Sequence, residues 1–351
     1  MMDLKIATWN LYQFAKPGTY WYERDERNDY EPDQWSEKKN WIGDMLVKLD
    51  ADIIGFQEIF SVDEFKAFMT EQGYPHVAVV DDPAIDPEDD SVFLGPVTGI
   101  ASRHPFTMQP AALKFPQELR DDTQLEEDFN FRRAITRAEI DTPQFGQVVV
   151  YVCHFKSQGA FIDSDAVAAH DGWKTRFREH LRARAIKDTD QLVRRSGDAA
   201  GVYLAAMDEL DDDNNKPLIV VGDMNDNPRS STLRILTQQE WIDNIAGKRR
   251  AGIEEARDRA WNFTWQLFDA YSLLPSQNSA TRPVTHAAGW RYPAETLDYI
   301  LVSNALNPKN PHHVASVTDL KIYSDHFDDA SKLLTTDHAP VCVTLTPRPG
   351  A

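Results

Sequence analysis

Six short segments, spread along the 351 residues of this chain, carry polar side chains of the types that bind metal ions and phosphate. Each segment ends a run of apolar, β-like residues, so neighbouring strands could bring these groups to one rim of a sheet. A rim of carboxylates, carboxamides and two imidazoles is equipped for metal-assisted attack of water on a phosphate ester. The segments are residues 7–10 (ATWN), 56–59 (FQEI), 152–155 (VCHF), 222–225 (GDMN), 296–299 (TLDY) and 336–339 (TDHA).

Glu58 and Asn10 are the candidates for binding a metal ion near the start of the chain. Mg²⁺ prefers hard oxygen ligands, usually one or two carboxylates, and keeps several waters. Glu58 ends an apolar strand, so its carboxylate is a candidate ligand. Asn10 could coordinate weakly, or hold a phosphate oxygen without adding charge. For each residue a cap or a turn is the ordinary alternative.

Asp223 and Asn225 flank Met224, after four aliphatic residues and a glycine that permits a tight bend. Asp223 could accept a proton from the attacking water or orient it, and Asn225 could steady that water or the phosphate. An Asx turn is the alternative reading of this pair, and a turn is compatible with catalysis.

Asp337 and His338 form the most specific pair in the chain. An imidazole near the phosphoryl group could move a proton or offset growing oxyanion charge, and an aspartate must fix its tautomer. Because neighbours along a strand point to opposite faces, Asp298 is the better partner for His338, and Asp337 the better metal ligand. His154 would be the second imidazole, protonating the leaving oxygen or gripping the phosphate.

Basic residues offer two further sets of contacts with an anion. Lys156 and Ser157 follow His154 directly and could add a cation and a hydroxyl, although Lys156 fits a solvated loop equally well. A separate basic run lies within residues 172–210, whose composition is helical. There, arginines spread over solvated helix faces are the ordinary case, and contact with a substrate backbone is the alternative. The run comprises Lys174, Arg176, Arg178, Arg182, Arg184 and Lys187.

The charge balance limits the partners, since 37 basic and 56 acidic side chains give a net charge of −19. This charge disfavours unassisted binding to nucleic acid, but it does not exclude a nuclease, because metal ions and local basic patches can supply attraction. Acidic residues cluster in residues 81–90, 118–128 and 208–213, which we interpret as solvated loops, with calcium sites as the lesser alternative. No CxxC pair, P-loop or GxGxxG motif is present.

Cys153 and Cys342 both lie in apolar, strand-like runs, which predicts small buried thiols and excludes a disulfide framework. The chain starts almost at once with a strand, without a charged and apolar leader, and it has no apolar stretch of membrane-spanning length. As written, it predicts a cytoplasmic protein without a membrane span. A secreted or periplasmic location would require that a signal peptide had been removed. We expect a monomer.

Apolar periodicity predicts many short strands alternating with a few helices. Ser61 and Glu64 suggest a capping box, with Gly73 ending that helix. Aromatic residues Trp261, Phe263, Trp265 and Phe268 could be core or lipid-facing, with core favoured. The predicted helices are 34–49, 61–72, 172–210 and 230–238. The predicted strands are 4–9, 50–58, 76–80, 99–102, 133–140, 147–155, 218–221, 297–302, 314–322 and 339–346, with a hairpin turn at 141–146 and an uncertain connection at 244–269.

Taken together, the motifs resemble those of the endonuclease/exonuclease/phosphatase superfamily, the group of deoxyribonuclease I, exonuclease III and the neutral sphingomyelinases. The resemblance also includes residues 99–105 (GIASRHP) and extends over essentially the whole chain in the right order. It implies an α/β fold in the form of a four-layer sandwich, two packed mixed β-sheets flanked by helices. It also implies one catalytic domain over residues 1–351, and hydrolysis assisted by Mg²⁺ or Mn²⁺, with Ca²⁺ as a further alternative.

The resemblance also implies roles for individual residues. Glu58 matches the metal-binding glutamate and Asn10 the asparagine beside it; Asp223 and Asn225 match the pair that handles the water. The other matches are Asp298 to the aspartate that orients the last histidine, Asp337 and His338 to the terminal metal-and-base pair, and His154 to the phosphate-contacting histidine. Asn10, Arg103, Lys156 and Ser157 are the candidate phosphate or substrate contacts.

Departures from the family pattern leave the substrate open. The Tyr-x-Pro-Asn signature of abasic-site endonucleases and the Cys-Asp-Arg signature of inositol polyphosphate 5-phosphatases are both absent. Thr296 stands where many relatives carry Arg, and no carboxylate partner for His154 is evident. Residues 154–159 (HFKSQG) look most like bacterial extracellular or exo/endo nucleases.

We therefore predict a divalent-metal phosphodiesterase, with a nuclease preferred and nucleic acid as the expected partner. One alternative is a phosphatase or a sphingomyelinase-like lipid phosphodiesterase, which the acidic balance favours. A non-catalytic binding module is the alternative of another class.

Overall fold

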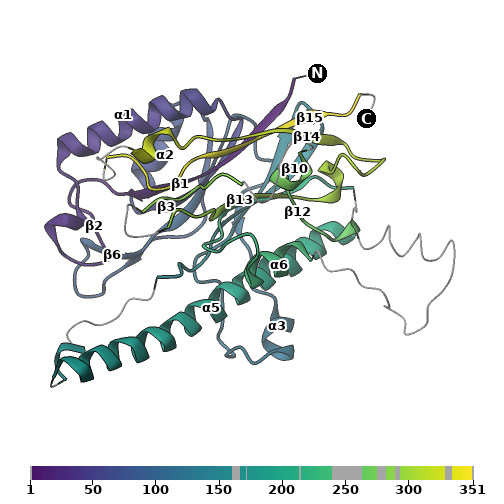
Figure 1. The fold of residues 1–351 in the computed structure, drawn as a ribbon. Helices are drawn as coiled ribbons and strands as arrows, with labels where there is room; N and C mark the ends of the chain where they lie inside the picture. The colour runs from purple at the N-terminus through teal and green to yellow at the C-terminus, as the bar shows by residue number, and fades with distance from the viewer. Residues whose placement is uncertain are drawn as a thin grey trace, which may run out of the picture.

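Two six-stranded mixed sheets form the centre of the computed structural model (Figure 1). The structure describes residues 2–159, 167–170, 172–212, 215–238, 263–274, 282–288, 293–328 and 334–349. Most of the uncertain connection 244–269, together with Trp261, lies outside these residues.

The first sheet has the strand order β14-β15-β1-β3-β7-β4. β1 and β3 are parallel, and the other neighbours in this sheet are antiparallel. Its strands are β1 (Leu4–Phe14), β3 (Ile53–Ile59), β4 (His76–Val79), β7 (Val97–Ser102), β14 (Ala315–Ile322) and β15 (Val341–Pro347).

The second sheet has the order β12-β13-β11-β10-β9-β8, with β10 and β11 parallel. The predicted hairpin is present, because β9 and β10 pair in antiparallel register. Its strands are β8 (Ala111–Ala112), β9 (Thr136–Thr142), β10 (Gly146–His154), β11 (Leu218–Asp223), β12 (Phe268–Asp269) and β13 (Asp298–Val302). A small third sheet joins β2 (Tyr20–Trp21), β6 (Val92–Gly95) and β5 (Ala84–Ile85).

The two large sheets pack face to face through aliphatic side chains such as Ile6, Ile53, Val150 and Val221. A Cβ atom at Gly55 would lie 2.6 Å from Cγ2 of Val221, so glycine is what allows the sheets to approach this closely. Burying one apolar face of each sheet in this way provides the main core of the fold.

Helices cover the outer face of each sheet, which completes the predicted four-layer α/β sandwich (Figure 1). α1 (Pro32–Leu49) and α2 (Val62–Glu71) pack on the first sheet. α5 (Trp173–Asp212) and α6 (Ser231–Thr237) pack on the second. The shorter helices are η1 (Glu26–Asn28), α3 (Gln117–Asp122), α8 (Ala270–Leu273), η3 (Asn304–Leu306) and η4 (Asp325–Asp328).

Two local predictions were wrong. Ser61 and Glu64 do not form a capping box, because the Ser61 hydroxyl accepts the Lys16 amide and Glu64 pairs with the Lys16 ammonium. The acidic cluster 208–213 is not a loop either, since α5 continues to Asp212, and the cluster 118–128 includes most of α3. In α5, Glu209 is paired with Arg137 and Lys216, which removes the charge repulsion expected of a solvated acidic run.

Other predictions agree with the structure. Cys153 and Cys342 are both buried and free. Trp265 and Phe268 pack against the core as predicted, but the core position favoured for Phe263 was wrong, because this side chain is 40% exposed. Within the described residues, none of the helices combines the length and the apolar character needed to cross a membrane.

Candidate active site

Strand alternation brings four of the predicted site residues to the face between the two sheets. Asn10 lies on the same face of β1 as Ile6, and His154 on the same face of β10 as Val150. Asp223 and Asp298 end β11 and begin β13, and they are direct partners in the antiparallel register. Because side chains two residues apart share a face, these groups lie at the edge of the core between the two sheets. We call this edge the rim.

Glu58 reaches the same rim through a break in this alternation. Regular pleating would turn it toward the helix-covered face, where Ile54 and Phe56 are buried. Instead Glu58 has a left-handed φ of 63°, and the pairing of β3 shifts register between Phe56 and Ile59. A positive φ at a residue other than glycine is strained, and bulges of this kind re-aim side chains at functional sites. The bulge therefore positions the carboxylate of Glu58 beside Asn10.

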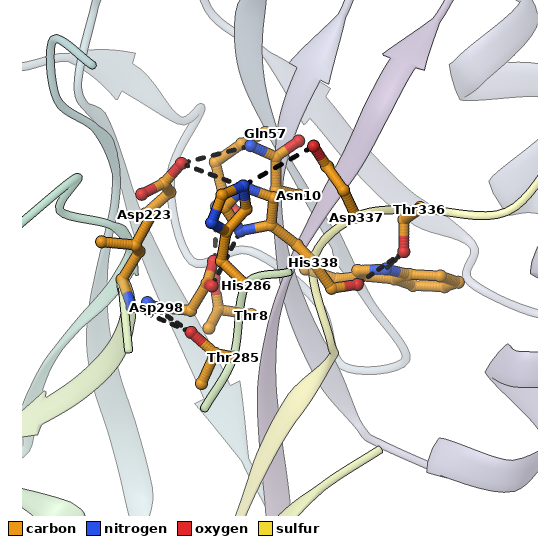
Figure 2. Close-up of polar contacts among 12 residues, drawn as sticks. Thr8, Asn10, Gln57, Asp223, Thr285, His286, Asp298, Thr336, Asp337 and His338 are labelled. Carbon is orange, nitrogen blue, oxygen red and sulfur yellow. Dashed lines mark hydrogen bonds and ion pairs between the residues drawn. The ribbon is translucent and has the colours of Figure 1, made fainter. Parts of the chain in front are cut away.

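Asp223 is the centre of the hydrogen-bond network (Figure 2). Its Oδ2 accepts hydrogen bonds from the side-chain amides of Asn10 at 3.2 Å and Asn225 at 3.1 Å. The same oxygen lies 3.7 Å from Nε2 of both His154 and His338. Burial raises the pKa of Asp223 to about 6, although the neighbouring imidazole of His338 lowers it in part. A carboxylate with this pKa can take up a proton near neutral pH.

Asn225 is held by the same turn. Its backbone amide donates to Oδ1 of Asp223 at 2.8 Å, and its side-chain amide also donates to the carbonyl of Phe155 at 3.0 Å. Gly222 makes the bend possible, since a Cβ atom there would lie 2.0 Å from the carbonyl oxygen of Cys153. The predicted Asx turn and the predicted site are thus the same structure.

His338 is oriented by Asp298, as the sequence predicted. Its Nδ1 lies 2.8 Å from Oδ2 of Asp298, so this nitrogen carries the proton and Nε2 faces Asp223. Asp298 is fixed by its own amide, which donates to the hydroxyl of Thr285. Burial opposes protonation of His338, but the carboxylates of Asp298 and Asp223 hold its pKa well above the usual value.

His154 differs from His338 in charge. Burial lowers the pKa of His154 well below its usual value, and the nearby Arg133 cation lowers it further. His154 is therefore neutral near pH 7. A neutral imidazole suits hydrogen bonding to a phosphate oxygen better than delivery of a proton to the leaving group. Among the residues that the structure describes, Asp223 is the carboxylate that lies closest to the His154 ring, at 3.7 Å.

Glu58 and Asp337 provide hard oxygen donors for a divalent cation. Glu58 accepts hydrogen bonds from the Asn10 side chain at 3.3 Å and the Gln13 amide at 3.1 Å. Burial raises the pKa of Glu58, and the charge of Asp337 raises it further, so the two carboxylates interact. Oδ1 of Asp337 is buried and has no hydrogen-bond partner among the residues that the structure describes. These donors fit Mg²⁺ or Mn²⁺.

Asn10 acts as a hydrogen-bond donor in this arrangement. Its Nδ2 donates to both Glu58 and Asp223, while its Oδ1 accepts the Tyr12 amide at 3.0 Å. Metal ligation would need that oxygen. A role for Asn10 in holding two carboxylates together is therefore better supported, and its role as a metal ligand stays a prediction.

Lys156 and Ser157 lie beside the rim, whereas Arg103 does not. Lys156 donates to the Ser157 hydroxyl at 3.2 Å, and burial together with nearby arginines lowers its pKa to about 8. Arg103 follows β7, which is antiparallel to β3, so it lies beside Asp50 and Asp52 at the opposite end of the sheet from Glu58. The prediction that Arg103 contacts phosphate with the other residues was wrong for this reason.

Two residues at the rim were missed by sequence reasoning. Arg133 donates to the carbonyl of Phe155 at 3.0 Å and influences both Glu58 and His154 electrostatically. His286 lies 3.6 Å from Asp337, and its ring centroid is 4.6 Å from that of His338. Neither residue ends an apolar strand, which was the signal used for the others. The sequence signal that could have revealed His286 is the isolated pair Thr285-His286, since His286 lies twelve residues before Asp298.

Lys38 links two of the segments that carry site residues. This side chain is 0% exposed, and its ammonium donates to the backbone carbonyls of Tyr12 and Thr335 at 2.9 and 3.0 Å. These two carbonyls belong to the segments that carry Asn10 and Asp337. Burial lowers the pKa of Lys38 from 10.5 to about 7.

The shifted pKa of Lys38 predicts a pH-dependent stability. Between pH 7 and 9 the unfolded chain keeps the Lys38 proton and the folded protein releases it, so the free energy of unfolding rises with pH by roughly 2 kcal/mol. In urea unfolding at pH 7, 8 and 9, Lys38→Met should lower this rise and leave the smaller part that Lys156 contributes, whereas Lys39→Met should keep all of it. Equal slopes for wild type and Lys38→Met would show that Lys38 does not titrate in this range.

Comparison with known proteins identifies the family. A family model described as the Endonuclease/Exonuclease/phosphatase family matches residues 7–326. The chain belongs to the endonuclease/exonuclease/phosphatase family. Members of this family are hydrolases of phosphoesters and generally depend on divalent metals. Among curated proteins, none matches this sequence.

Solved structures of the endonuclease/exonuclease/phosphatase family share the fold. The catalytic domain of human Nocturnin with bound sulfate is 16% identical (TM-score 0.54), over 99% of this chain and 95% of that one. A mannosyl-6-phosphatase from Bacteroides thetaiotaomicron VPI-5482 is 16% identical (TM-score 0.54), over 98% and 99%. D. rerio TDP2 complexed with single-strand DNA product is 12% identical (TM-score 0.52), over 99% and 100%. Identities this low indicate fold and leave substrate open.

Proposed function

We propose that this protein is a divalent-metal phosphodiesterase in which water attacks phosphorus, and that its substrate is a polynucleotide. The observation that carries the hydrolytic part is the position of Asp223. Its Oδ2 lies 3.7 Å from two imidazole nitrogens, and Asn10 joins it by hydrogen bonds to Glu58. The rim thus combines the base Asp223, the imidazoles of His154 and His338, and the carboxylate of Glu58.

The residues divide the work by charge. Asp223 accepts the proton of the attacking water, and Asn225 keeps the Asp223 carboxylate oriented. His338, held by Asp298 and protonated, offsets negative charge that develops on the phosphoryl oxygens, and its Nε2 proton passes to the leaving oxygen as the bond from phosphorus to that oxygen breaks. Neutral His154 donates a hydrogen bond to the phosphate. A divalent cation, Mg²⁺ or Mn²⁺, held by Glu58 and Asp337 would supply Lewis-acid polarisation of the phosphoester.

The N-terminal half of α5 supports the polynucleotide part of the proposal. Arg195 of this helix donates to the carbonyls of Lys156 and Ser157 just after β10, which places it at the rim. The helix begins at Trp173, about 30 Å further along its axis. Figure 1 shows this half extending away from the sheets, below β2 and β6. It could therefore follow a long substrate that leaves the rim.

The surface of this projecting half, residues 173–187, suits a single strand. It holds six basic side chains and one acidic one, in a chain of net charge −19. Trp173 and Phe177 are 77% and 52% exposed, and their rings are stacked with centroids 5.5 Å apart. They occupy the same helix face as Arg195, because at 3.6 residues per turn positions 173, 177 and 195 fall within about 40° of one another around the helix axis. Basic side chains attract phosphates, and exposed aromatic rings stack with bases.

One comparison tests both parts of the proposal. The chelated protein is refilled with Mg²⁺ or Mn²⁺ and given one of five substrates: single-stranded oligodeoxynucleotide, RNA, bis-(p-nitrophenyl) phosphate, the monoester p-nitrophenyl phosphate, or sphingomyelin vesicles. We expect cleavage of an oligonucleotide and of the small diester, each dependent on metal. A variant with Trp173→Ala, Phe177→Ala, Lys174→Ala and Arg184→Ala, all on one side of α5, should raise the KM for the oligonucleotide about ten-fold, with small-diester turnover unchanged within about two-fold.

Ile186→Ala with Val193→Ala is the matched control, because these exposed residues lie on the opposite side of α5. This control should leave both activities intact. Turnover of sphingomyelin or of a phosphate monoester alone would support the phosphatase or lipid alternative instead, in which the basic helix meets an anionic surface. Absence of hydrolysis with every metal and substrate would support a binding module and overturn the proposal.

A further inference from the structure

We propose that His286 binds the metal ion together with Asp337, and that this imidazole makes the centre prefer Mn²⁺ and other transition ions over Mg²⁺. The inference rests on the proposed function only in placing a cation at Asp337. It concerns a residue that the motif pattern of the chain did not reveal.

Backbone pairing places the His286 side chain at the rim. The Ala287 amide donates to the carbonyl of Asp337 at 2.9 Å, and the Ala339 amide donates to the carbonyl of Thr285 at 2.7 Å. His286 and His338 are therefore directly opposite each other in an antiparallel bridge. Side chains of such a pair lie on the same face and close together. Their ring centroids are accordingly 4.6 Å apart (Figure 2).

The position of His286 is fixed from its other side as well. Its backbone amide donates to the carbonyl of Glu295 at 2.9 Å, and the Glu295 amide donates back at 3.0 Å. His286 thus lies between two backbone partners, with its ring largely buried. A side chain held in place before binding loses little entropy when it becomes a ligand.

The ring atoms are placed as two ligands of one ion would be. Nε2 of His286 lies 3.6 Å from Oδ2 of Asp337, too far for a hydrogen bond. Two ligands about 2.1 Å from a shared ion are separated by roughly 3 to 3.6 Å, depending on the angle between them. Nδ1 of His286 and Oδ1 of Asp337 are also buried without a hydrogen-bond partner within the described ranges. One ion beside this pair would use the Nε2 and a carboxylate oxygen.

Ligand atoms of His286, Asp337 and His338 all lie within 4.8 Å of one another, but the other two imidazoles at the rim lie beside other carboxylates. Nδ1 of His338 faces Asp298 at 2.8 Å, and its Nε2 faces Asp223. Nε2 of His154 also faces Asp223. His286 is therefore the imidazole best placed to join Asp337 on the metal. Mg²⁺ takes almost only oxygen ligands, whereas Mn²⁺, Co²⁺ and Zn²⁺ accept imidazole nitrogen. A nitrogen donor here favours the transition ions.

The full-length protein is first stripped of metal and then loaded with Mn²⁺. Electron spin-echo envelope modulation of the bound Mn²⁺ tests directly whether His286 coordinates the ion. We expect modulation from a directly coordinated imidazole ¹⁴N in wild type and its loss in His286→Phe. Titration calorimetry should show a ten- to hundred-fold weaker Mn²⁺ affinity in His286→Phe and a change of less than about two-fold for Mg²⁺. His286→Gln restores an oxygen donor and should bind Mg²⁺ as wild type does.

Two results would overturn the proposal. One is an absence of nitrogen modulation in wild-type protein that binds Mn²⁺, a result that needs no folded variant. The other is modulation that persists in His286→Phe, which would assign the nitrogen to His154 or His338. All these measurements are made without substrate. A protein that binds Mn²⁺ through His286 but hydrolyses nothing would refute the proposed function alone.

Discussion

Replacing His338 with alanine should lower the rate of small-diester hydrolysis by about 10³-fold or more, while the fold remains intact. Two aspartates converge on this ring, with Asp298 at 2.8 Å from Nδ1 and Asp223 at 3.7 Å from Nε2. Alanine removes the cationic donor that we assign to the phosphoryl group. Initial rates with saturating metal, together with circular dichroism and thermal unfolding, measure the effect.

The matched control for His338 is His312→Ala, since His312 is exposed and lies outside the site. It should retain wild-type activity. Asp298→Asn keeps the imidazole but removes the charge that raises its pKa, so the activity that remains should depend on a group titrating at lower pH. A folded His338→Ala protein with full activity would contradict the role given to this residue.

Glu58→Gln should lower metal-dependent hydrolysis by at least about 10²-fold and abolish stabilisation by metal. Glu58 and Asp337 are the two carboxylates that we assign to the cation, and their partial burial limits screening of their charges by water. In wild type, adding Mn²⁺ should raise the midpoint of thermal unfolding, because the ion binds the folded state. In Glu58→Gln the midpoint should not respond to submillimolar Mn²⁺.

Glu64→Gln is the control for this experiment. Glu64 lies six residues further along and pairs with Lys16 at the surface, so its loss should change neither metal response nor rate. Should Glu58→Gln keep the wild-type shift in unfolding midpoint, the cation would have to be held by other residues.

The sequence predicted the site best where regular strands position it. Asn10, His154, Asp223 and Asp298 all occupy the faces that strand alternation assigns to them. Asp298 as the partner of His338 followed from the same rule, and the 2.8 Å contact agrees with it. Periodicity is sufficient there because a sheet with one buried face has a single acceptable register.

Irregular backbone limited the prediction elsewhere. Alternation alone turns Glu58 away from the site, and only its left-handed φ and the bulge in β3 return it to the rim. His286 reaches the rim through an isolated bridge outside the named strands. Arg103 was misplaced because its motif follows a strand that runs opposite to β3. Bulges, bridges and strand direction depend on tertiary contacts, which local sequence does not encode.

Hydrolysis in ¹⁸O-labelled water is the most direct test of the central claim that these residues direct water onto phosphorus. The chelated protein is refilled with Mn²⁺ and mixed with a smaller amount of a phosphodiester, so that each enzyme molecule turns over at most once. Both products are then analysed by mass spectrometry. We predict one ¹⁸O atom in the phosphate product and none in the alcohol, and no reaction before metal is restored. Label in the alcohol, or equal turnover with and without metal, would contradict it.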